Sequence, residues 1–209
     1  MSDESTSSFE VEAKFALATS QTDGATAAAA LRERLLAAGF VAKTPERHRD
    51  TYFAHPARDF AATDEALRLR QEVYETPGAT SPQSRTLITY KGPREPGPVK
   101  SREEREVPLA GLAVSGAEMS RIFERLGFRP VRDVIKRREP FVCESESGLV
   151  VTVTIDEVDE LGWFAEVERV ITNESREETA ERVLEVAASL GLPVDHIESR
   201  SYLAILFER

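Results

Sequence analysis

Charged and apolar residues alternate near the start of the chain. Glu10, Glu12 and Lys14 are separated by single residues, with Val11 and Ala13 between them. Successive side chains of a β-strand point to opposite faces, so in a strand these three charged groups share one face. Two carboxylates and an ammonium fit a wet, charged cavity where oxygen ligands hold a hard cation. For this stretch alone, a solvated strand face is an equally good interpretation.

The same spacing of charged residues recurs in later stretches. The basic residues with this spacing are Lys14, Arg68, Arg70, Lys91, Arg102, Lys136 and Arg138. The acidic ones are Glu10, Glu12, Glu104, Glu106, Asp156, Glu166 and Glu168. Neighbouring like charges are costly unless a facing carboxylate or a bound anion offsets them. Guanidinium and ammonium groups bind phosphate oxygens, and carboxylates hold Mg²⁺ or Mn²⁺. The two sets together favour a site for a metal-bound polyphosphate chain.

These charged residues fall on short segments with strand-like alternation. Strands are predicted at residues 9–15, 50–53, 66–70, 86–91, 102–107, 134–138, 149–157 and 163–171. Helices are predicted at residues 23–40, 115–127, 175–191 and 197–207. Asp23, Ser115 and Ser175 stand where side-chain oxygens can cap three of these helices. Residues 55–59, 76–84 and 94–100 are predicted as breaks or loops because proline and glycine recur there.

Most predicted strands have one ionic face and one apolar face. A closed antiparallel barrel places the ionic faces in its lumen and leaves an apolar outer face for helices to cover. The predicted fold is therefore α+β, a β-barrel tunnel with a charged lumen and helices outside. The 209 residues are predicted to form a single domain.

Composition narrows the classes of function. Hydrophobic residues make up 41% and charged residues 31%, which is typical of a soluble globular protein. No apolar run approaches the ~18 residues of a membrane helix, and the first residues do not resemble a signal peptide. Cys143 is the single cysteine, so a cytoplasmic location is expected. The net charge of −10 argues against broad binding to nucleic acids or anionic membranes.

The charged motifs, taken in order, resemble the CYTH superfamily, also called triphosphate tunnel metalloenzymes. The resemblance covers nearly the whole chain, and its strength lies in the order of motifs that are weak singly. Residues 50–60 and 63–70 are most similar to the archaeal form of class IV adenylyl cyclase. The matching motifs lie at residues 10–14, 67–70, 90–93, 102–106, 136–138, 156, 164–168 and 201–203.

The resemblance assigns a role to each matching residue. The triphosphate-binding and catalytic residues would be Lys14, Arg68, Arg70, Lys91 and Arg138, with Lys136 assisting. The ligands of two Mg²⁺ or Mn²⁺ ions would be Glu10, Glu12, Asp156, Glu166 and Glu168. The supporting residues would be Arg102, Glu104 and Glu106. Arg200 stands where the family often has a lysine, and it could bind phosphate but could not act as a tunable base.

The resemblance also implies an activity. An adenylyl cyclase of class IV type would convert ATP to cyclic AMP and pyrophosphate. The alternative is a triphosphatase acting on inorganic triphosphate, thiamine triphosphate or a nucleoside triphosphate. A non-catalytic polyphosphate binder is a third hypothesis, which the full carboxylate set disfavours. The expected partner is a small-molecule triphosphate, and the family resemblance suggests a homodimer.

The remaining reactive side chains have structural interpretations. His48, His55 and His196 show no metal-ligand spacing, and His55 precedes a proline in a predicted turn. Cys143 has no histidine motif nearby, which favours an inert thiol. Tyr202 is interpreted as a core residue.

Overall fold

The fold is described from a computed structural model, which covers residues 8–209 apart from 77, 79–80, 82, 110–113 and 146–147. The strands are β1 (Ser8–Ala16), β2 (Val41–Ala42), β3 (Glu46–Ala54), β4 (Ala66–Tyr74), β5 (Gln83–Lys91), β6 (Lys100–Leu109), β7 (Arg129–Glu144), β8 (Val150–Val158) and β9 (Gly162–Ile171). The helices are α1 (Gly24–Ala37), α2 (Phe60–Thr63), α3 (Val114–Arg125), α4 (Arg176–Ser189) and α5 (Tyr202–Phe207), with a 3₁₀ turn at Val194–His196.

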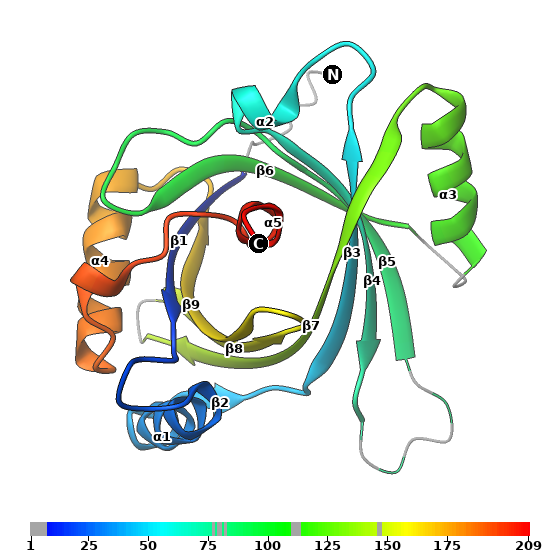
Figure 1. The fold of residues 1–209 in the computed structure, drawn as a ribbon. Helices are drawn as coiled ribbons and strands as arrows, with labels where there is room; N and C mark the ends of the chain where they lie inside the picture. The colour runs from blue at the N-terminus through cyan, green and yellow to red at the C-terminus, as the bar shows by residue number, and fades with distance from the viewer. Residues whose placement is uncertain (1–7, 77, 79–80, 82, 110–113, 146–147) are drawn as a thin grey trace.

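The strands form a closed antiparallel barrel. Their order is β7-β3-β4-β5-β6-β1-β9-β8, and pairing between β7 and β8 closes the ring. In the part of the chain that the structure describes, β2 pairs with β7 outside this eight-stranded ring. Figure 1 shows the strands arranged as a ring, with α5 at the centre of the view. The predicted closed barrel is therefore confirmed.

Strand β1 shows how the alternation sorts side chains between the two faces. Val11, Ala13 and Phe15 are at most 1% exposed and lie in the main apolar cluster. Glu12 and Lys14 are also buried, but they line the lumen. Because the apolar side chains point outward, the main hydrophobic core lies between the barrel wall and the helices, and the lumen is free for ionic groups.

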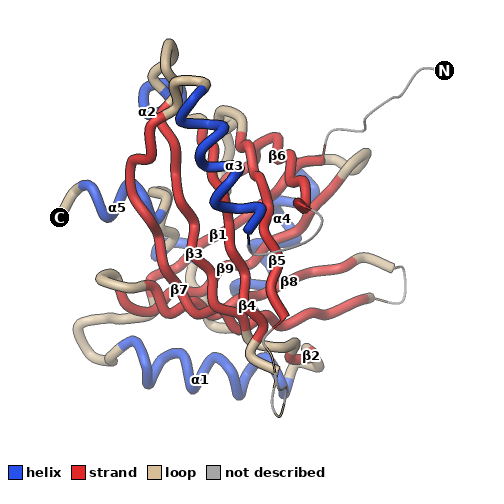
Figure 2. Tube along the Cα trace, turned by 90° about the vertical axis from the view of Figure 1, so that its right-hand side faces the viewer, coloured by secondary structure: helices blue, strands red, loops and turns tan. Residues whose placement is uncertain are grey.

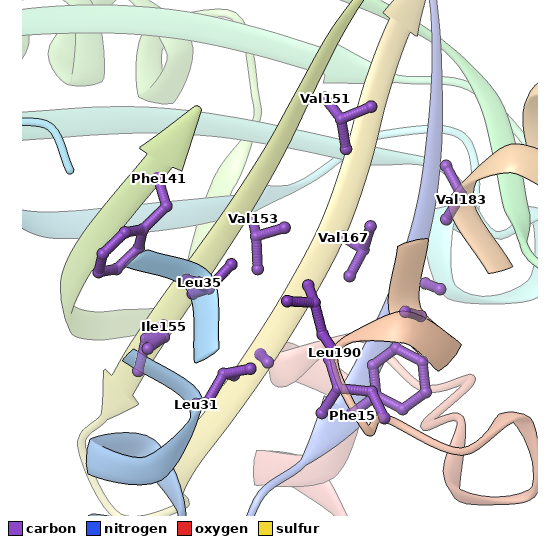
Figure 3. Packing of buried hydrophobic residues seen from close by; sticks show 14 of the residues in the cluster. Phe15, Leu31, Leu35, Phe141, Val151, Val153, Ile155, Val167, Val183 and Leu190 are labelled. Atoms are coloured by element: carbon purple, nitrogen blue, oxygen red, sulfur yellow. The ribbon is translucent and has the colours of Figure 1, made fainter. Parts of the chain in front are cut away.

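Helices α1 and α4 cover one side of the barrel wall. Helix α1 packs on β9, and α4 packs on β1 and β9. Figure 3 shows Leu35 and Leu31 of α1 near Val153 and Ile155 of the wall, and Leu190 after α4 near Phe15, all in one apolar cluster. Helix α3 packs against β4, β5 and β7 elsewhere on the ring. The predicted outer covering of helices is confirmed.

Two of the predicted caps form. Asp23 accepts a hydrogen bond from the backbone N–H of Thr26 at 3.0 Å, and Ser175 accepts one from Glu178 at 3.2 Å. Each bond satisfies a backbone donor that a helix start leaves free. Helix α3 begins at Val114, close to the predicted start, but the side chain of Ser115 lies outside the described residues.

Two short helices stand at one mouth of the barrel. Helix α2 lies in the connection between β3 and β4, and Asp59 caps its first turn. Helix α5 projects from the same end of the ring (Figure 2), and both helices contribute side chains to the lumen cavity. The sequence pattern did not predict α2, because a single turn is too short to show helical periodicity.

Several strands are longer than predicted. Strand β7 runs from Arg129 to Glu144, whereas alternation predicted residues 134–138 only. It pairs with β3 along one part and with β8 along another, so tertiary pairing extends it past Pro130 and Pro140. Among the described residues, the structure contains no helix with the length and apolarity needed to span a bilayer.

The helix–barrel contact makes a testable prediction. Leu35 on α1 is fully buried in the core cluster, whereas the adjacent Leu36 is 55% exposed. We expect Leu35→Ala to lower the free energy of unfolding by about 2–5 kcal/mol, because it leaves a cavity between α1 and the wall. We expect Leu36→Ala to change it by no more than about 0.5 kcal/mol. Urea denaturation followed by circular dichroism measures both, and equal losses would contradict this packing.

Candidate active site

The barrel lumen contains a cavity of about 580 Å³. Side chains from most of the ring strands and from α2 and α5 line it. All predicted site residues line this cavity except Asp156 and Arg200. Its charged lining is Glu10, Glu12, Lys14, Asp50, Asp64, Glu65, Arg68, Arg70, Lys91, Arg94, Lys100, Arg102, Glu104, Glu106, Lys136, Arg138, Glu166 and Glu168.

A buried carboxylate holds the two arginines of β4. Asp50 on β3 pairs in register with Arg70. Arg70 donates to both oxygens of Asp50 through Nε at 2.7 Å and Nη2 at 2.8 Å, and Arg68 donates through Nη1 at 3.2 Å. Burial alone would raise the pKa of Asp50, but the guanidinium groups of Arg70 and Arg68 lower it well below the usual value. Asp50 therefore stays ionised and fixes both guanidinium groups.

A second buried carboxylate holds the two cations of β7. Asp156 on β8 is fully buried and accepts from Lys136 at 2.8 Å and from Arg138 through Nε at 2.8 Å and Nη2 at 2.7 Å. The Tyr202 hydroxyl donates a further hydrogen bond at 3.0 Å. Burial would raise the pKa of Asp156, but Arg138 and Lys136 lower it. The oxygens of Asp156 face these donors instead of the cavity, so the structure does not place Asp156 with the carboxylates that line it.

Four lining glutamates come together on β1 and β9. Glu12 lies directly opposite Glu168, and Glu166 also accepts a hydrogen bond from Arg138. Burial raises the pKa of Glu168 to about 8, and the carboxylates of Glu10 and Glu166 add to the rise. These acids repel one another, so a divalent cation among them would stabilise the cluster. An all-oxygen donor set is the kind that Mg²⁺ and Mn²⁺ prefer, so the residues fit the implied metal.

Other lysine and arginine side chains in the lumen pair with the lining glutamates. Lys91 donates to Glu10 and lies 3.2 Å from Glu104. Lys100 donates to Glu12 at 3.0 Å. The remaining supporting groups lie beside these pairs. Glu104 and Glu106 lie 3.6 and 3.9 Å from Arg68, and Arg102 donates to the Asp64 carbonyl at 3.4 Å.

Lys14 is held from the far end of the chain. Its Nζ donates to the backbone carbonyl of Arg200 at 2.5 Å and lies 4.2 Å from the centre of the Tyr202 ring. Burial, with the nearby Lys100, lowers its pKa to about 7. The Arg200 guanidinium instead bonds Glu198 and Glu208. Arg200 thus meets the site through its carbonyl, and its side chain does not line the cavity.

Comparison with known proteins agrees with this geometry. The model of the CYTH domain matches residues 8–202. The chain belongs to the CYTH family. It is 33% identical over 174 residues to the "Putative adenylate cyclase" of Methanocaldococcus jannaschii, covering 83% of this chain and 89% of the relative.

Solved CYTH-type structures share the fold. The PH1819 protein from Pyrococcus horikoshii superposes with a TM-score of 0.74 at 34% identity, covering 95% of this chain and 98% of that one. A Vibrio parahaemolyticus protein of the same name as the M. jannaschii relative superposes with a TM-score of 0.69 at 20% identity, covering 95% and 98%. The motif resemblance is confirmed, and the family as a whole acts on triphosphates.

The structure adds residues that sequence reasoning left out of this CYTH site. Asp50 lay on a predicted strand, and its register with Arg70 was the missing information. Lys100 lies in the predicted loop at residues 94–100, but it begins β6. Tyr202 is buried, as expected of a core residue, but it also contacts Lys14 and Asp156. Local alternation predicts neither the register between strands nor which distant segments of the chain come into contact.

The Asp50 cluster predicts a large loss of stability on neutralisation. Asp50→Asn removes the counter-charge of two buried guanidinium groups, so we expect the free energy of unfolding to fall by about 3–5 kcal/mol. Asp159→Asn, at an exposed position after β8, is the matched control and should have little effect. Urea denaturation measures the free energy of unfolding of both variants. An unchanged value for Asp50→Asn would refute the conclusion that Asp50 compensates the two guanidinium groups.

Proposed function

We propose that this chain is a metal-dependent enzyme acting on a triphosphate in the barrel lumen, and that its reaction is the conversion of ATP to cyclic AMP and pyrophosphate. The observation that carries the proposal is the convergence of buried cations and carboxylates from several strands on one cavity inside the barrel. The identity to an archaeal relative named as a cyclase supports the choice of reaction.

The lining cations are suited to bind the phosphate chain. Arg68 and Arg70 present fixed guanidinium groups, since Asp50 orients both. Arg138 is oriented in the same way by Asp156. Oriented donors of this kind bind phosphate oxygens without further ordering. We assign triphosphate binding to Lys14, Arg68, Arg70, Lys91, Lys136 and Arg138.

The glutamate cluster is the proposed metal site. Glu10, Glu12, Glu166 and Glu168 would hold Mg²⁺ or Mn²⁺, and Asp156 would act as a positioning residue for Lys136 and Arg138 instead of as a ligand. When bound, such ions neutralise phosphate charge and favour ionisation of the attacking hydroxyl. Glu104 and Glu106 would orient the basic residues around them, and Arg200 would contribute its carbonyl to holding Lys14.

The cyclase reaction needs an in-line displacement at the α-phosphorus. The ribose 3′-oxygen forms the new bond to the α-phosphorus and gives up its proton to solvent, while the bond from that phosphorus to the bridging oxygen breaks and pyrophosphate leaves. The lining arginines and lysines stabilise the negative charge that grows on pyrophosphate. Phe60, Leu203 and Phe207 line the cavity beside these groups and offer an apolar surface to the nucleoside.

A triphosphatase is the second candidate, and one observation favours it. Lining cations come from β1, β4, β5, β6 and β7, so a phosphoryl group in the lumen would have positive charge on several sides. A terminal phosphoryl group enclosed in this way would also be activated for attack by water. The substrate would then be inorganic triphosphate or an organic triphosphate.

A product assay separates the two reactions. Purified protein with Mg²⁺ or Mn²⁺ is given ATP and inorganic triphosphate separately, and the products are identified by chromatography. We expect cyclic AMP and pyrophosphate from ATP. Orthophosphate without a cyclic product would establish the triphosphatase, and tight binding without turnover of either substrate would overturn the proposal of an enzyme.

Variants test the site itself. We expect Arg68→Ala and Glu12→Gln each to lower kcat/KM by about 10²–10³-fold, because each removes charge placed for the transition state. Arg121→Ala is the control, since Arg121 is a 72% exposed side chain on α3 that pairs only with Glu118 among the described residues. Wild-type rates in Arg68→Ala or Glu12→Gln would refute the site assignment.

A further inference from the structure

A second group of potential metal ligands lies inside the barrel but outside the cavity lining. Glu46 and His48 are on β3 and Glu72 is on β4, with His48 directly opposite Glu72 in the β3–β4 pair. One ligand atom from each residue lies within 4.8 Å of the others. His48 and Glu72 are buried, and Glu46 is partly exposed. The group therefore combines a nitrogen donor, two oxygen donors and a path to solvent.

The donor atoms converge on one point. His48 Nε2 lies 2.6 Å from Glu46 Oε2 and 3.7 Å from Glu72 Oε1. Donors in zinc-type sites lie about 2.0–2.2 Å from the ion, so atoms this close to one another can reach a single ion with small side-chain adjustments. A proton on Nε2 satisfies only the nearer carboxylate. A cation between the three atoms would satisfy all of them.

Neighbouring side chains orient the ligands from behind. Glu72 uses Oε2 to accept hydrogen bonds from Arg85 and, at 3.2 Å, from Tyr74. Its Oε1 is thereby turned toward His48. Bonds of this kind to the outer oxygen of a ligating carboxylate are what fix the geometry of protein metal sites.

The imidazole of His48 is buried and has a ring nitrogen without a partner in the part of the chain that the structure describes. His48 is 2% exposed, and its Nδ1 has no hydrogen-bond partner among the described residues. A neutral imidazole can bind a metal through the lone pair of one ring nitrogen while the other nitrogen carries the proton.

The surrounding charges select among cations. Arg85 bonds Glu72, and Arg70 lies 3.9 Å from it, so part of the negative charge of the group is already compensated. Mg²⁺ binds mainly through charge and prefers oxygen donors, whereas imidazole suits Zn²⁺ and Co²⁺. A partly neutralised group with one imidazole is thus better matched to these metals than to Mg²⁺.

We propose that Glu46, His48 and Glu72 form a binding site for a divalent transition metal such as Zn²⁺, separate from the all-oxygen metal site of the lumen cavity. The inference goes beyond the proposed function and does not depend on it. Because Glu72 lies 3.9 Å from Arg70, the occupied site would be next to one of the proposed triphosphate-binding cations.

The test measures metal binding without turnover. Zn²⁺ is titrated by calorimetry into the full chain in the presence of saturating Mg²⁺, which fills the cavity site. We expect one Zn²⁺ to bind, and His48→Gln to weaken it at least tenfold. His196→Gln is the matched control, since His196 is exposed at the end of the 3₁₀ turn. Equal affinity in His48→Gln and the wild type, or an equal loss in His196→Gln, would overturn the proposal.

A second measurement needs no substitution. The chain has three histidines, so ¹⁵N-histidine NMR resolves each ring. We expect one equivalent of Zn²⁺ to shift a His48 ring nitrogen and to leave His55 and His196 unchanged. Glu12→Gln, which removes a proposed ligand of the cavity metal, should leave this shift intact. An unshifted His48 resonance at one equivalent would overturn the proposal even where His48→Gln fails to fold.

Discussion

The whole structure depends on charge compensation inside a closed barrel. Ionic side chains taken out of water are strongly destabilising unless partners with good geometry surround them. Asp50 and Asp156 supply that compensation, each buried between two cations of a neighbouring strand. With those pairs in place, guanidinium and ammonium groups can stay charged and fixed around an internal cavity.

The outer face follows from the same arrangement. With the lumen occupied by ionic groups, the apolar half of each strand must be buried on the outside, against helices. Phe15, Val153 and Val167 from the wall share one apolar cluster with Leu31 and Leu35 from α1, and this cluster replaces the interior core of an ordinary small barrel. The main apolar core therefore lies outside the wall, and the groups suited to chemistry lie inside it.

Local alternation was enough to predict the fold and most of the cavity lining. Glu10, Glu12 and Lys14 point inward because a strand allows two faces only, and the apolar partners of each strand fix which face is buried. Asp156 follows the same rule and points inward, yet its oxygens accept hydrogen bonds from Lys136 and Arg138. Alternation gives the face of a residue but not its partner.

The features that could not be predicted depend on long-range geometry. The contact of Lys14 with the Arg200 carbonyl joins residues 186 positions apart, and no local pattern encodes it. The short helix α2 and the group of Glu46, His48 and Glu72 likewise depend on which strands become neighbours. A histidine two residues from a glutamate on one strand becomes informative only when the facing strand is known.

The pairing of β1 has a consequence for synthesis of the chain. Both neighbours of this first strand, β6 and β9, come from much later in the sequence. At about 5–20 residues per second, a ribosome needs roughly 7–30 s to reach β9 after finishing β1. During that interval the nascent strand exposes unpaired backbone and an apolar face. High contact order of this kind slows folding. The early strands must therefore be kept from pairing wrongly until β9 has been synthesised.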